Sequence, residues 1–133
     1  MKQKFILLLM GSVCLALSAQ AQTVPQGQVQ YPTAVIAIST TTSAALATGG
    51  ASLVGCQLPA AFTGTSISFT VATSLGGTYQ ELDNSSGKVS YTVAAGKYIV
   101  INPVDFYGVQ YFKIVSNSSE AAARSLVCSL KGI

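Results

Sequence analysis

Acidic side chains are the main candidates for catalysis or metal binding in this 133-residue chain, because it contains no histidine to act as a general base or metal ligand. There are four of them: Glu81, Asp83, Asp105 and Glu120. Glu81 and Asp83 would share one face of a strand about 7 Å apart, a spacing that is also common at solvated strand ends. No serine or cysteine has a histidine to activate it. We therefore expect a protein that is not an enzyme.

Glycine and oxygen-rich segments could hold a metal ion or a phosphate group. Residues 83–87, DNSSG, offer clustered oxygens but lack the alternating acidic ligands of a calcium loop, so a hairpin turn is the favoured interpretation. The glycine pairs at 49–50 and 76–77 are not followed by the lysine or helix of a phosphate-binding loop. We expect turns at all three places and no metal or cofactor.

Two of the three cysteines, Cys56 and Cys128, fall in apolar segments with a strand-like pattern. Alternation of side chains puts Cys56 on one face with Val54 and Leu58, and it puts Cys128 on one face with Leu126 and Leu130. Both cysteines are therefore expected to point toward a core. Two buried thiols are one interpretation. A disulfide between an early strand and the last strand is the other, and export from the cytoplasm would favour it.

The start of the chain is typical of an export signal. Lys2 and Lys4 precede an uncharged apolar run over residues 5–17, and residues 19–21 (Ala-Gln-Ala) predict cleavage before Gln22. The apolar run is shorter than the ~20 residues that a spanning helix needs, and cleavage before Gln22 would remove it. We therefore expect no stable membrane span if the leader is cleaved. An uncleaved N-terminal helix is the alternative.

Few charges remain after this leader. Residues 22–133 carry five basic and four acidic side chains, and binding to nucleic acid needs clustered lysine and arginine. We therefore expect no nucleic-acid partner. A surface built from serine, threonine, glycine and alanine suits packing against other subunits or an extracellular environment better than it suits a highly soluble cytoplasmic monomer.

The pattern after residue 33 predicts one all-β domain over residues 34–133. Alternation is clearest in TSISFTVAT, where Ile67, Phe69 and Val71 share one face. Seven or eight short strands at about ten-residue spacing, with turn residues between them, are typical of an antiparallel sandwich or barrel. Residues 22–33 contain two prolines and no periodicity, which predicts an extended arm.

Two strands, at residues 98–101 and 109–114, carry apolar side chains on both faces, which predicts a central position in the sandwich. A second apolar face needs a cover, which could be a loop, the arm or another subunit. We expect an interface there, and its members are predicted to be Phe112 and Ile114, the exposed Tyr107 beside a glycine, and Tyr31 on the arm.

Three segments resemble small β-sandwich proteins found in the virion gene clusters of tailed phages: LPAAFTGTSISFTVATSLGGTYQEL (58–82), VAAGKYIVINPVDFYGVQYFKIVS (93–116) and AAARSLVCSLKG (121–132). The likeness lies in the T-x-x-x-I-S-F strand, a Gly-Thr-aromatic hairpin and the P-x-D-F-x-G segment before an aromatic-rich strand. It implies a jelly-roll-like sandwich that decorates a capsid or forms the base of a head fibre. It carries over no catalytic residue.

Two functions fit these features. The first is a virion structural protein, a homo-oligomer that binds other virion subunits through surface packing. The second is an exported bacterial adhesion or carbohydrate-binding module, secreted or periplasmic, that holds a glycan or a cell-surface ligand with its aromatic side chains. A virion protein assembled in the cytoplasm has no evident need for an export leader. A full-length chain in a lattice would favour the first function, and a soluble monomer beginning at Gln22 would favour the second.

Overall fold

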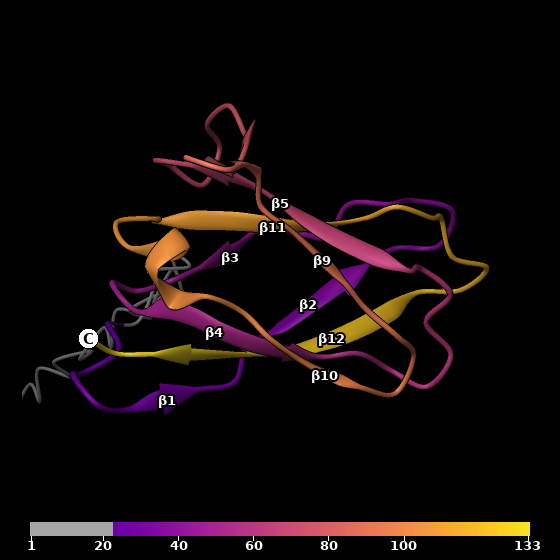
Figure 1. Cartoon of the computed structure of the whole chain (residues 1–133), viewed down its shortest axis with the longest axis horizontal. Coiled ribbons are helices and arrows are strands. Elements are labelled where there is room, and N and C mark those ends of the chain that lie inside the picture. The colour runs from indigo at the N-terminus through magenta and orange to yellow at the C-terminus, as the bar shows by residue number, and fades with distance from the viewer. Residues whose placement is uncertain (1–22) are drawn as a thin grey trace, which may run out of the picture.

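The computed structural model describes residues 23–133, so the signal-like leader and its predicted cleavage site lie outside the described residues. The described chain forms two five-stranded sheets and a two-stranded hairpin, and every strand pair is antiparallel. The two larger sheets pack face to face (Figure 1). The predicted all-β sandwich is confirmed. Within residues 23–133, no helix is long and apolar enough to cross a membrane.

The two sheets have matching layouts. Sheet 1 contains β1 (Val29–Gln30), β2 (Thr33–Ile36), β12 (Arg124–Lys131), β4 (Ser52–Gln57) and β10 (Tyr98–Val100). Sheet 2 contains β3 (Leu46–Ala47), β11 (Tyr111–Ser116), β5 (Ser66–Ala72), β6 (Gln80–Glu81) and β9 (Ser90–Thr92). Both β1 and β2 pair with β12, and both β6 and β9 pair with β5. The main strand orders are therefore β2-β12-β4-β10 and β3-β11-β5-β9.

The core lies between the sheets, and aromatic rings fill its centre. Phe69, Phe106 and Phe112 are fully buried, and their rings meet edge to face with centroids 5.0 Å (Phe69 and Phe106) and 5.6 Å (Phe106 and Phe112) apart. Burial of each ring contributes about 1.5–3 kcal/mol. The alternation predicted for β5 is confirmed for Ile67 and Phe69, which are buried, while Val71 is half-buried.

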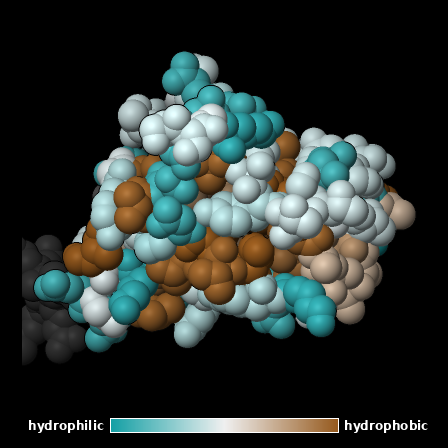
Figure 2. Space-filling view, in the orientation of Figure 1, coloured by the Kyte–Doolittle hydropathy of each residue, from teal (hydrophilic) through white to brown (hydrophobic). Residues whose placement is uncertain are grey.

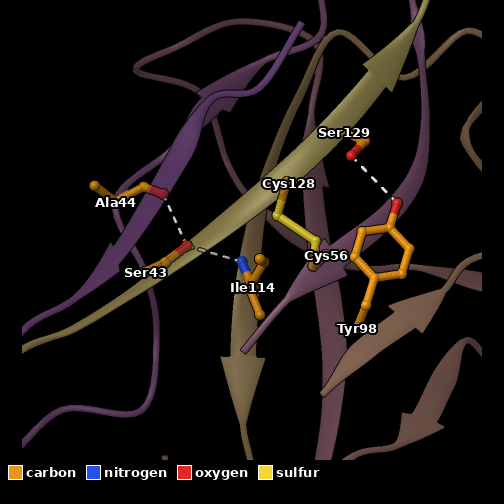
Figure 3. The surroundings of a disulfide bond; sticks show 7 residues. All are labelled: Ser43, Ala44, Cys56, Tyr98, Ile114, Cys128 and Ser129. Atoms are coloured by element: carbon orange, nitrogen blue, oxygen red, sulfur yellow. Dashed lines mark hydrogen bonds between the residues drawn. A yellow bond between two sulfur atoms is a disulfide. The ribbon is translucent and has the colours of Figure 1, made fainter. Parts of the chain in front are cut away.

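A disulfide joins Cys56 of β4 to Cys128 of β12 (Figure 3). The two cysteines lie directly opposite each other. The Cys128 N–H donates to the Pro32 carbonyl at 2.9 Å, on the side of β12 away from β4. Cys56 and Cys128 therefore form a non-hydrogen-bonded pair between β4 and β12, the kind of position at which antiparallel strands approach most closely. Their Cα atoms are 4.0 Å apart. Of the two interpretations of the sequence, the structure has the disulfide.

A bulge changes the predicted facing of residues in β4. The register shifts so that Gly55 lies opposite Ser129 while Leu53 lies opposite Leu130, which leaves Val54 as the extra residue of a β-bulge. Leu53 is fully buried and Val54 is half-buried. The expectation that Val54 would share the inward face with Cys56 was therefore wrong.

The predicted arm is extended, but it is docked on the domain. Val29 pairs with Lys131, and Gln26 forms a bridge with Gly132. Val24 is buried in the core. The packed domain therefore begins well before residue 34, because the arm adds a short edge strand to sheet 1.

The strand at residues 98–101 lies at an edge, which corrects the central position expected for it. Among the described strands, β10 pairs with β4 alone, at the end of sheet 1. Tyr98 and Val100 are 51% and 71% exposed, whereas Ile101 is buried. The preceding strand β9 cannot cover this edge, because it pairs with β5 in the other sheet. The strand β11, in contrast, has the central position expected of it, between β3 and β5.

A short connection ties the two sheets together at one side. The Ser43 N–H donates to the Ile114 carbonyl at 2.8 Å, and the Ser43 hydroxyl accepts from the Ile114 N–H at 2.9 Å (Figure 3). The next residue, Ala44, donates its N–H to the Val35 carbonyl of β2. Residues 43–44 therefore bridge β11 of sheet 2 and β2 of sheet 1.

Candidate functional site

The four residues predicted to form an interface divide into two groups. Tyr107 and Tyr31 are 54% and 67% exposed, as an interface requires. Phe112 and Ile114 are fully buried, so their assignment to an accessible face was wrong. Alternation along β11 directs these two side chains into the core, and it is Tyr111, Lys113 and Val115 that face outward, each half-buried.

The chain itself supplies a cover for this outward face of β11. The Lys113 ammonium lies 4.2 Å from the ring centroid of Tyr79, a cation–π contact. The Tyr79 hydroxyl donates to the Leu75 carbonyl at 2.9 Å, which holds the loop against the sheet. Burial, and to a lesser extent the neighbouring Tyr111, raises the pKa of Tyr79. This loop therefore covers the part of the outward face around Lys113 and Tyr111.

A broader exposed surface lies on the outside of sheet 1. Since Cys56 and Cys128 point inward, their strand neighbours Gln57 and Val127 point outward. We use "sheet 1 outer face" for the seven outward residues Thr33, Val35, Gln57, Tyr98, Val100, Ser125 and Val127, placed by strand register. All seven are exposed and none is charged. Figure 2 shows apolar residues gathered over the part of the view that β4, β10 and β12 occupy.

Tyr98 is the aromatic centre of the sheet 1 outer face. Its ring lies against Gly55, where an added Cβ would overlap the ring. Its hydroxyl donates to the Ser129 hydroxyl at 3.2 Å (Figure 3). The ring therefore crosses from β10 over β4 to β12 and flattens this part of the face, because glycine leaves room for it.

A second candidate site is a pocket beside Tyr107, with a volume of about 230 Å³. The end of β5, β6 and the loop before β11 line it. The lining residues of this "Tyr107 pocket" are Val71, Ala72, Thr73, Gln80, Tyr107, Gly108, Val109 and Gln110. They combine an exposed aromatic ring, two amides and a hydroxyl, and none of them is charged.

Local structure fixes the backbone that carries Tyr107. The sequence Asn-Pro starts a short 3₁₀ helix, η1 (Pro103–Phe106), because the Asn102 side chain accepts from the Val104 N–H at 3.2 Å and proline suits a first helical position. The Tyr91 hydroxyl accepts from the Asn102 N–H at 2.9 Å. Phe106 anchors the end of η1 in the core. Tyr107 therefore follows directly after a buried anchor.

A third hollow, about 310 Å³ in volume, lies on the outside of sheet 2. Its lining is rich in hydroxyl groups and consists of Ser66, Ser68, Lys88, Ser90, Val115, Ser116 and Asn117. Its charged and amide groups already have partners: Lys88 pairs with Glu81 at 2.9 Å, and the Asn117 amide bonds both to the Thr65 N–H and to its hydroxyl. It therefore offers a ligand less than the Tyr107 pocket does.

The acidic residues have structural partners. Glu120 is buried, and its carboxylate accepts hydrogen bonds from Thr63, Gly64 and Arg124. Burial alone would raise the pKa of Glu120, but the bonds from Thr63, Gly64 and Arg124 outweigh it and hold the pKa below its ordinary value. With both oxygens engaged, this carboxylate joins two loops instead of facing a substrate.

The segment considered for calcium binding forms a hairpin of β7 (Asp83–Asn84) and β8 (Gly87–Lys88), which confirms the predicted turn. Residues 23–133 contain no group of three or more histidine, cysteine or acidic side chains that could hold a metal ion.

Comparisons of the chain with protein-family models, curated proteins and solved structures gave no match.

The sequence predicted the exposure of Tyr107, but it did not predict most residues of the sheet 1 outer face or of the Tyr107 pocket. The outward facing of Val127 follows from the same alternation that places Cys128 inward, so that signal was present. The exposure of Tyr98 and Val100 had no such signal, because it depends on which strand lies at the sheet edge. Half of the pocket lining comes from residues 71–73 and from Gln80, which lie in or next to β5 and β6 and are distant from Tyr107 in the sequence.

Proposed function

We propose that this protein is a non-enzymatic structural subunit that binds its neighbours through the sheet 1 outer face. The assembly is the virion of a tailed phage, where the subunit decorates the capsid or forms the base of an appendage, as the sequence resemblance implies. The observation that carries the proposal is the exposed, uncharged character of this face.

The composition of the sheet 1 outer face favours a protein partner. The cores of protein interfaces are depleted in charged residues and enriched in aromatic residues, and this face has Tyr98 at its centre and three exposed valines around it. Burial of apolar area contributes about 25 cal/mol per Å². Repetition of one contact over a lattice multiplies a modest pairwise affinity, so a small face is enough for a decorating subunit.

The strand order supports a jelly-roll form of the sandwich. The eight main strands form the orders β2-β12-β4-β10 in sheet 1 and β3-β11-β5-β9 in sheet 2. Along the chain, each of these strands lies in the other sheet from the one before it, except that β5 and β9 both lie in sheet 2. Jelly rolls of eight strands occur in viral capsid domains and also in lectins. The architecture therefore fits a capsid subunit, but a fold alone does not specify a function, which depends on the residues at the surface.

A charge placed in the sheet 1 outer face tests the proposal. Val127→Glu should abolish self-association in sedimentation velocity and remove the protein from purified particles, because a buried carboxylate would have no partner. Leu75→Glu is the matched control, since Leu75 is also exposed but lies in the loop after β5. Wild-type protein that stays monomeric at every concentration and is absent from particles would refute the proposal.

The second candidate is an exported adhesion or carbohydrate-binding module, and the disulfide is the observation that favours it. Disulfides persist in secreted and periplasmic proteins and are rare in the cytoplasm. The intact mass of the protein from its native source decides between the candidates. Loss of residues 1–21 together with a gain of two hydrogens on reduction would favour export, and a full-length chain recovered in particles would favour the virion.

A further inference from the structure

We propose that the Tyr107 pocket binds a neutral saccharide. The ring of Tyr107 would stack on the C–H face of one sugar residue, and the side chains of Gln80, Gln110 and Thr73 would bind its hydroxyl groups. This ligand-binding function is additional to subunit packing and deepens the second candidate function, and it uses none of the residues of the sheet 1 outer face.

The aromatic ring is exposed, and the backbone that carries it is fixed by hydrogen bonds. Tyr107 is 54% exposed, although it directly follows the fully buried Phe106. Its N–H donates to the Val104 carbonyl at 3.3 Å, and the Val109 N–H donates to the Phe106 carbonyl at 3.1 Å. Gly108, with φ of +79°, allows the turn between them. A ring on such a fixed backbone loses little conformational entropy on binding.

The polar groups around the ring suit hydroxyl ligands. Gln80 and Gln110 are exposed, and each side-chain amide both donates and accepts hydrogen bonds, as sugar hydroxyls do. Thr48 holds the main chain of Gln110 with an N–H to carbonyl bond of 2.9 Å. The Gln110 side chain therefore extends from a fixed point on the pocket rim.

The lining also excludes other classes of ligand. None of the eight lining residues is charged, so an ionic ligand would lose hydration without gaining a counter-charge. An entirely apolar ligand would leave the two amides and the hydroxyl without partners. The volume of about 230 Å³ is below the roughly 300–1,000 Å³ of pockets for drug-sized ligands. A single sugar ring, with an apolar face and a hydroxyl edge, meets all three conditions.

Titration followed by ¹H–¹⁵N NMR tests the proposal, with glucose, galactose and N-acetylglucosamine as neutral probes and glucuronate as the charged comparison. At least one neutral sugar should shift the signals of Gly108 and of the Gln80 and Gln110 side-chain amides, with a dissociation constant on the order of 1 mM. Tyr107→Ala should weaken this binding about tenfold or more, and Tyr107→Phe should keep most of it, because the ring remains.

Controls separate the site from the fold and from subunit packing. Tyr31→Ala removes another exposed tyrosine, which lies outside the pocket, and this variant should bind as wild type does. If Tyr107→Ala loses the dispersed spectrum of a folded protein, Gln110→Ala serves as the second variant and should weaken binding several-fold. Val127→Glu should keep sugar binding even though it disrupts association, so the two proposals fail independently.

Three results would overturn the saccharide site. The first is the absence of shifts at pocket residues with all three neutral sugars. The second is wild-type affinity in folded Tyr107→Ala. The third is tighter binding of glucuronate than of every neutral sugar, since the lining has no cation to favour it.

Discussion

Removal of the disulfide by the paired substitutions Cys56→Ala and Cys128→Ala should destabilise the protein by about 4 kcal/mol. The bridge spans 72 residues of sequence, and the chain-entropy model for a closed loop of that length predicts about 4.4 kcal/mol at 25 °C. Both cysteines are fully buried, so the loss of two sulfur atoms adds a small packing penalty. For a domain of this size the change corresponds to a fall of roughly 15–20 °C in Tm.

Urea unfolding followed by circular dichroism measures this effect. The free energy of unfolding should fall, and the m-value should rise, because the unfolded chain without a cross-link exposes more surface. A reductant added to the wild type should reproduce the loss, and the same reductant should leave the alanine variant unchanged. Since a domain typically has 5–15 kcal/mol of stability, a loss of about 4 kcal/mol would remove between a quarter and most of it.

A loss below about 1 kcal/mol, or an equal response of wild type and variant to reductant, would refute this reasoning. Either result would mean that the bridge does not restrict the unfolded chain. The intact mass under non-reducing conditions would then show whether the bridge had formed in the sample.

Two further predictions concern the loops and the outer face. The pKa of Glu120 is held below its ordinary value of 4.5, so the ionised carboxylate stabilises the fold above that pH, and this contribution should be lost as the pH falls through the folded-state pKa. In Glu120→Gln, the free energy of unfolding should therefore depend less steeply on pH between about 5 and 2. An unchanged slope would contradict this role of Glu120. Gly55→Ala should destabilise by about 1 kcal/mol, because a Cβ there overlaps the Tyr98 ring and the ring must move off β4. Most of that loss should disappear in a Tyr98→Ala background, and an equal loss in both backgrounds of the double-mutant cycle would show that the ring contact is not its cause.

Local patterns were enough to predict several parts of the fold. The alternation in β5 predicted that Ile67 and Phe69 face the core, and the segment at residues 83–87 predicted a hairpin turn. The position of Tyr107 beside a glycine in a connection predicted its exposure. Each of these features depends on neighbouring residues along the chain, which sequence displays directly.

The errors concern features that distant parts of the chain create. Phe112 and Ile114 were assigned to an outer face because both faces of β11 are bulky, and the sequence does not say which one the opposite sheet covers. The strand at residues 98–101 was placed centrally, although its neighbour in the chain belongs to the other sheet. The bulge at Val54 arises from the register between β4 and β12, which are more than sixty positions apart in the sequence.

The sequence by itself determined the class of the protein: an all-β chain with inward-facing cysteines and no histidine to support acid–base chemistry. Only the tertiary structure decided that Cys56 lies opposite Cys128, that Tyr98 lies on an open sheet face, and that Gln80 lies beside Tyr107. The physical reason is that side-chain alternation is a local property with a period of two, whereas strand register, sheet edges and pockets are set by which distant segments pair.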